Sequence, residues 1–215
     1  MILICCVINS KSGGSIIDGG DTHLEVDARN GNLTMDAVGG IGEGNPLEIR
    51  VASLDASSSS TGDISLNETD AVTLTDIVNK DGAINITSGG TMTVFRVKTE
   101  GGKDSDDIFL TNTEGNMPLV PLPNNEYNVI AVGEGDIFLT SAGTINGGRF
   151  SADVSNLSGT TLGLDNPPVA DISDFTVTLS QKNELNLAGQ MRETGRLSSF
   201  PPEAAVDLNE PAVFL

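Results

Sequence analysis

Three aspartates beside paired glycines form the segment of this sequence that is best suited to chemistry. The segment reads Gly101-Gly-Lys-Asp-Ser-Asp-Asp-Ile-Phe109. It matches the calcium nonapeptide Gly-Gly-x-Gly-x-Asp-x-apolar-x at each fixed position except the fourth, where Asp104 replaces Gly. The carboxylates of Asp104, Asp106 and Asp107 would supply the hard oxygen ligands that Ca²⁺ prefers. Such sites are shared between consecutive copies, and this sequence holds one copy, so an acidic turn without metal is the alternative. No other cofactor is expected.

Two phenylalanines occupy the same position of a repeated pentapeptide. Asp107-Ile-Phe-Leu-Thr111 returns as Asp136-Ile-Phe-Leu-Thr140, a spacing of 29 residues (136 minus 107). Phe109 and Phe138 each lie between two apolar residues, so both are expected to point outward from a strand. On neighbouring strands they would stack as an exposed aromatic pair, which could contact a sugar or a protein. The alternative is that the loop at 117–128 covers them.

Residues for catalysis are scarce. His23 is the single histidine, and no Ser or Cys nucleophile with an orienting acid has a recognisable spacing around it. The sequence has no Gly-x-Gly-x-x-Gly or Gly-Lys-Ser/Thr loop that would bind a phosphate. Its few arginines are not clustered as a polysaccharide lyase would need. We therefore expect that the protein is not an enzyme.

The charge balance excludes two classes of partner. The chain has 30 acidic and 11 basic residues, a net charge of -19 and a pI of about 4.1. An acidic surface repels nucleic-acid phosphates and anionic lipids.

Cys5 and Cys6 are adjacent and give neither a disulfide framework nor a zinc site. The apolar start is too short for a signal peptide or a membrane span.

The elements that must position these residues are strands. Apolar residues alternate with polar ones in runs of five to seven residues, for example in 47–51, 64–66, 84–86, 108–110 and 137–139. Period two with Gly, Asn and Asp between the runs is typical of strands that bury one face. The chain is therefore predicted to be all-β.

A repeat favours one all-β architecture over another. Looser copies of the pentapeptide give motif starts at 31, 62, 82, 106 and 135. Repeats of 20 to 50 residues indicate a solenoid. In a parallel β-helix like residues stack on like residues, whereas the strands of a β-sandwich have no reason to share a motif. The Asn-Gly and Asp-Gly turns keep an antiparallel β-sandwich open as the alternative.

The chain divides into three parts. Residues 1–20 are expected to form an N-terminal strand and turn with a truncated start, and 21–190 the repeat region, with the proline-rich loop at 117–128 inserted. Residues 191–215 are expected to form an irregular, truncated tail, because the alternation fades there.

Gly31 to Ala56 and Thr61 to Leu74 carry a resemblance to a known family. The first stretch contains a strand, Gly39-Gly-Ile-Gly42, a step of small residues and Asn45-Pro-Leu47, and the second contains Gly62-Asp-Ile-Ser-Leu66. This order resembles the shaft repeats of filamentous-haemagglutinin-type bacterial exoproteins.

The resemblance implies a right-handed parallel β-helix in a secreted or surface-attached adhesin, stacked on further coils of a longer chain. It implies an extracellular or cell-surface location and a host-cell, glycan or surface-protein partner. A carbohydrate-binding or carbohydrate-active β-helix protein and a calcium-dependent β-sandwich module are the alternatives.

Overall fold

The described chain consists of β-strands and one short 3₁₀ helix, η1 (Pro123–Asn125). The computed structural model describes residues 7–151 and, beyond them, the backbone of 154–159, 161–163, 174–179, 185–186, 191–193 and 196–198. The strands are β1 (Val7–Ser12), β2 (Val26–Ala37), β3 (Leu47–Thr61), β4 (Ile64–Glu68), β5 (Val72–Asp81), β6 (Ile84–Ser88), β7 (Met92–Thr99), β8 (Ile108–Asn112), β9 (Met117–Leu119), β10 (Val129–Ile130), β11 (Ile137–Ser141), β12 (Thr144–Gly147), β13 (Phe150–Ser151), β14 (Val154–Gly159), β15 (Thr161–Gly163), β16 (Asp174–Leu179), β17 (Leu185–Asn186), β18 (Met191–Glu193) and β19 (Arg196–Ser198).

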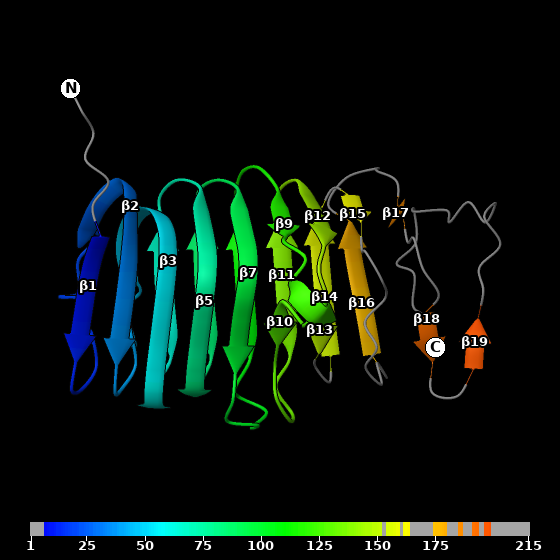
Figure 1. The fold of residues 1–215 in the computed structure, drawn as a ribbon, viewed down its shortest axis with the longest axis horizontal. Coiled ribbons are helices and arrows are strands. Elements are labelled where there is room, and N and C mark those ends of the chain that lie inside the picture. Colours follow the sequence, from blue (N-terminus) through cyan, green and yellow to red (C-terminus); the bar gives the residue numbers. More distant parts are fainter. Residues whose placement is uncertain are drawn as a thin grey trace.

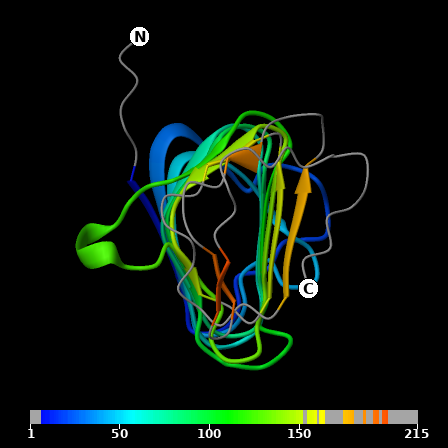
Figure 2. The same ribbon diagram turned by 90° about the vertical axis from the view of Figure 1, so that its right-hand side faces the viewer.

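Successive coils stack in parallel. β8 pairs with β6 on one side and with β11 on the other, and strands β1 to β17 all join this parallel pairing. Figure 1 shows the coils following one another along the long axis, as a β-solenoid of about seven turns. Strands descend on the side of β7 and ascend on the side of β16. Seen from the C-terminal end, the chain therefore winds counter-clockwise as it comes toward the viewer (Figure 2), which is a right-handed winding. The predicted parallel β-helix is confirmed.

The antiparallel sandwich is wrong for this chain. Among the described strands the one antiparallel pair is β18 with β19, which lies outside the stacked coils. Asn-Gly and Asp-Gly turns suit solenoid corners as well as hairpins, because both need positive φ. The glycines at the corners therefore did not distinguish the two architectures.

Each coil has three faces. The motif face contains β4, β6, β8, β11, β14 and β16. The opposite face contains β1, β10 and β13 with the C-terminal parts of β2, β3, β5 and β7. The third face joins them through the first residues of β5 and β7, followed by β9, β12, β15 and β17.

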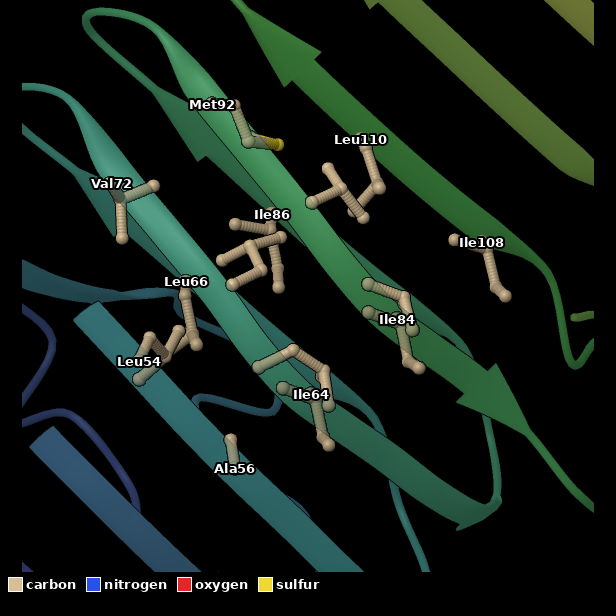
Figure 3. Close-up of a cluster of buried hydrophobic side chains, with 14 of the residues drawn as sticks. Leu54, Ala56, Ile64, Leu66, Val72, Ile84, Ile86, Met92, Ile108 and Leu110 are labelled. Carbon is tan, nitrogen blue, oxygen red and sulfur yellow. The ribbon is translucent and has the colours of Figure 1, made fainter. Parts of the chain in front are cut away.

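The core is a set of columns in which like residues lie one above another. On the motif face the first column is Ile41, Ile64, Ile84, Ile108 and Ile137, all fully buried. Figure 3 shows Ile64, Ile84 and Ile108 in succession, with Leu66, Ile86 and Leu110 beside them. Burial of each such side chain contributes roughly 1.5–3 kcal/mol. The narrow core therefore gains its stability from repetition and needs few aromatic residues.

One motif copy lies on a different face from the one that the sequence suggests. Gly31 to Met35 was expected to align with the later motif strands, but Leu33 pairs with Leu54, and its column continues through Leu74 and Val94 to Leu119 on the third face. The residue that precedes Ile64 in the motif column is Ile41. The prediction placed this copy on the wrong face, because all three faces share the same period-two alternation.

The proline-rich insertion projects from the side of the solenoid that carries β10 (Figure 2). Its first residues form β9, so the projecting part follows Leu119 and includes η1. Asn128 closes its base, because the buried amide Nδ2 donates to Phe95 O (2.8 Å) and Val120 O (2.7 Å). The loop is thus fixed where it leaves and where it rejoins the coil.

The two end segments are described in part. β1 extends the parallel ladder into the segment predicted as an N-terminal strand, since it pairs with β2 from Val7↔Asn32 to Ser12↔Ala37. Of the predicted tail, the structure describes β18 and β19, and the rest lies outside the described residues.

Candidate functional site

The repeated pentapeptide forms two adjacent strands of the motif face. β8 and β11 pair in register, so Phe109 lies beside Phe138. Their ring centroids are 4.7 Å apart and the ring planes differ by 4°. The prediction that the two strands stack in parallel and that their aromatic rings pair is confirmed.

The aromatic pair is not covered by the proline-rich loop. η1 projects on the side of β10, whereas β8 and β11 belong to the wall that β16 continues, on the other side of the coil (Figure 2). Phe109 is 36% exposed. The alternative in which residues 117–128 cover the rings is therefore wrong, because the insertion leaves the coil from another face.

The stacking geometry restricts what the pair could bind. In a parallel stack each ring presents one face to the other ring, and the ring edges point away from the strand. A ligand that stacks on aromatic faces would have only the two outer faces, one of them beside Asn85, the outward residue that pairs in register with Phe109. The arrangement suits a ladder that stabilises the coils better than an open aromatic platform.

The structure uses the three predicted calcium ligands in different ways. Asp104 is exposed. Asp106 is fully buried, and its Oδ2 accepts a hydrogen bond from Lys103 N at 2.9 Å. Asp107 Oδ1 accepts one from Asp136 N in the next coil at 2.9 Å. Among the described residues these three carboxylates do not form a group whose oxygens all lie close together. Calcium binding by this trio stays a prediction.

A different acidic group does converge. Asp18, Glu25 and Glu48 have carboxylate oxygens that all lie within 4.8 Å of one another. Glu25 precedes β2 and Glu48 belongs to β3 one coil later, and Glu25 N donates to Glu48 O at 2.9 Å. Such a group could hold a cation, but these side chains are partly or fully exposed, and exposed acidic groups are common without a metal.

The pKa values of two members of this acidic group shift in opposite directions. Burial raises the pKa of Glu25, and nearby Asp18 raises it further. The hydrogen bond from Asn45 lowers the pKa of Asp18. Sequence reasoning missed the group because its members are far apart in the chain. The 23-residue spacing of Glu25 and Glu48 (48 minus 25), close to one coil, was the one available signal.

A buried carboxylate lies inside the solenoid. Glu68 ends β4, is 4% exposed, and stacks between Ile49 and Ser88. Its Oε2 accepts a hydrogen bond from Val51 N (3.0 Å) and its Oε1 one from Asp70 N (3.1 Å). Burial raises the pKa of Glu68 to about 7, against the opposing effect of these two hydrogen bonds. The carboxylate therefore fixes the corner between the motif face and the third face.

Basic side chains outside the core form ion pairs, most of them between coils. Arg96 makes two hydrogen bonds to Asp76, which lies beside it in register. The other described pairs are Lys11–Asp36, Arg29–Asp27, Arg50–Asp27, Arg50–Asp70, Lys80–Glu100, Lys98–Glu100 and Lys103–Asp81. Exposed pairs of this kind contribute little each. They nevertheless occupy the basic side chains that an anionic ligand would need.

His23 is exposed, and its Nδ1 lies 2.9 Å from Asp21 Oδ1 in a turn before β2.

In the described part of the chain, no helix is long and apolar enough to cross a membrane. Comparison with protein-family models, with curated proteins and with solved structures found no match to this chain.

Proposed function

We propose that this chain is a structural shaft segment of a secreted or surface-attached bacterial adhesin, without catalytic activity. The observation that carries the proposal is the in-register parallel stacking of the coils along one axis. Backbone hydrogen bonds and apolar columns join each coil to the next, so a load along the axis is shared by all three faces. A stiff rod of this kind holds a binding surface away from a cell.

The corner glycines support the family resemblance on which the proposal draws. Gly40 and Gly42 frame Ile41 in the Gly-Gly-Ile-Gly segment, and Gly42 has a φ of +65°. A Cβ on Gly42 would lie 2.1 Å from Ser65 O, and a Cβ on Gly40 2.8 Å from Asp63 O. The segment that resembles the shaft repeats is therefore one that the stacking of coils requires to be glycine.

The surface supports a scaffold better than a catalytic groove. The outward positions of the motif face hold short polar side chains at Ser65, Asn67, Asn85, Thr87, Thr111 and Thr140, with the phenylalanine pair among them. Most of the described basic side chains are engaged in the ion pairs noted above. We propose that the partner is a host-cell, glycan or surface-protein ligand, bound by the parent chain outside the cell, and that neither nucleic acid nor insertion into a membrane is involved.

Surface labelling tests this proposal directly. Antibodies raised against the purified chain would be used for immunogold electron microscopy of intact producing cells. We expect label on the cell surface or on fibres that extend from it, without permeabilisation. Label that appears only after permeabilisation would overturn the proposal. A glycan array probed with the chain separates the carbohydrate-binding alternative, because a pure shaft segment gives no saturable glycan signal.

A further inference from the structure

The corner between β7 and β8 contains buried side-chain oxygens that have no hydrogen-bond partner. Ile84 and Ile108 are 24 residues apart (108 minus 84), whereas Ile64 and Ile84 are 20 apart (84 minus 64), although all three stack in one column. The four additional residues form a small loop after Gly101. We call residues 99–107 the loop corner.

Asp106 closes this loop from the inside. Its Oδ2 accepts Lys103 N, and Asp106 N in turn donates to Lys103 O at 3.0 Å. A Cβ on Gly101 would lie 2.1 Å from Asp106 Oδ2, so the carboxylate occupies the space that a side chain there would take. The other oxygen, Asp106 Oδ1, is buried and has no hydrogen-bond partner.

Two neutral side chains of the same corner also have a buried oxygen without a hydrogen-bond partner. Asn79 and Thr99 are register partners on β5 and β7, and both are fully buried. Asn79 Nδ2 crosses the corner to Gly62 O and Ala83 O, both at 2.9 Å, which leaves Asn79 Oδ1 without a partner. Thr99 is too short to cross the corner in the same way, and its Oγ1 is also without a partner.

The register brings these three residues to the inner side of one corner. Ile84 pairs with Ile108, so Asp107 lies over Ala83 and Asp106 lies over Gly82. Ala83 O is a carbonyl that Asn79 holds. Asp106 thus stacks on the turn whose carbonyl Asn79 holds, and Thr99, the register partner of Asn79, belongs to the same coil as Asp106. Three buried oxygens without a hydrogen-bond partner therefore belong to the same corner in two adjacent coils.

We propose that Asn79 Oδ1, Thr99 Oγ1 and Asp106 Oδ1 bind one Ca²⁺ ion inside the loop corner. A buried carboxylate with one N–H donor is costly unless a cation compensates it. Ca²⁺ prefers oxygen ligands and accepts irregular coordination completed by carbonyls and water, whereas Mg²⁺ requires near-octahedral geometry. The net charge of -19 also concentrates cations near the chain. This site differs from the sequence prediction, since Asp104 is exposed and Asp107 is engaged with Asp136.

Calorimetric titration of the full chain with CaCl₂ at fixed ionic strength tests the site. With one carboxylate among the ligands we expect a Kd on the order of 0.1–1 mM. Asp106→Asn should abolish the saturable heat. Asp104→Asn is the matched control, because it removes the same charge from the same loop and should bind as the unmodified chain does. MgCl₂ should give no saturable heat in any variant.

A second variant keeps the test decisive if Asp106→Asn does not fold. Thr99→Val has the same shape and removes one ligand oxygen, so it should weaken Ca²⁺ binding several-fold. The thermal midpoint of the unmodified chain should rise with millimolar Ca²⁺, and that of Thr99→Val should rise less. Equal heats in all variants would indicate surface binding only. No heat and no shift of the midpoint would indicate that a water molecule occupies the corner. Either result overturns the proposal.

Discussion

Asp107 Oδ1 accepts a hydrogen bond from the backbone N–H of Asp136, the residue that occupies the same position one coil later. Asp63 makes the same contact with Ala83 N at 2.8 Å. The aspartate that opens the repeated pentapeptide therefore joins one coil to the next. The strand begins directly after it, so this side chain covers a backbone donor at the corner where the strand ladder has not yet started.

Removal of this contact should destabilise the corner. Asp107→Ala leaves Asp136 N without its carboxylate acceptor, and we expect the free energy of unfolding to fall by about 1–2 kcal/mol. Urea denaturation followed by far-UV circular dichroism measures the change. Asp63→Ala should have a similar effect because its contact is equivalent. Asp104→Ala, which removes an exposed charge nearby, should change stability by no more than about 0.5 kcal/mol.

The stacked phenylalanines should be energetically coupled. In a double-mutant cycle of Phe109→Ala and Phe138→Ala we expect a coupling energy of about 1 kcal/mol, because stacked aromatic pairs with offset rings add roughly 0.5–1.5 kcal/mol beyond their burial. Chemical denaturation of the four proteins supplies the values. The cycle of Thr111→Ala with Thr140→Ala, at the next outward position of the same two strands, is the control. Equal coupling in the two cycles would mean that the ring contact adds nothing.

Glu68 should make stability depend on pH. Burial raises its folded-state pKa from 4.5 to about 7. The folded state therefore holds the proton more tightly than the unfolded state does. The contribution of protonated Glu68 to the free energy of unfolding is fully present below about pH 4.5 and is lost as the pH rises through about 7. A shift of this size corresponds to roughly 3 kcal/mol across the window.

Glu68→Gln should remove this dependence. The amide oxygen can accept one of the two backbone N–H groups, and its NH₂ opposes the other, so a constant loss of stability is expected at every pH. The difference in urea midpoint between the two proteins should therefore narrow from pH 5 to pH 7.5. Glu114→Gln, at an exposed carboxylate, should run parallel to the unmodified chain. Parallel curves for Glu68→Gln as well would show that Glu68 is not protonated in the fold.

The stacking of β8 on β11 could be predicted from the sequence because identical residues at a fixed spacing require identical surroundings. The face of each strand could not. Leu33 and Ile64 have the same alternating neighbours, yet they lie on different faces, since alternation specifies inside and outside and not direction. The last residues of four motif strands form an inward polar column: Glu68, Ser88, Asn112 and Ser141. An alignment of the motif copies in the sequence would have predicted this column. The Asp18 group depends on contacts between distant turns, which no local pattern encodes.

Gly82 offers a test of why the corners are glycine. Its φ is +138°, and a Cβ there would lie 2.6 Å from Gly62 O in the preceding coil. Gly82→Ala therefore combines an unfavourable backbone conformation with a clash against backbone that cannot move without separating two coils. We expect the free energy of unfolding to fall by at least about 3 kcal/mol.

The control for Gly82→Ala is Gly44→Ala, which separates the two causes. Gly44 has a φ of +84°, but a Cβ there would meet no atom within 4 Å. Only the backbone strain remains, so the loss should be about 1 kcal/mol. Urea denaturation of both variants gives the comparison. Because the clash at Gly82 is with the neighbouring coil, its larger loss would measure how closely the coils approach. Equal losses at the two positions would mean that conformational preference alone selects glycine, and that the spacing between coils tolerates a methyl group.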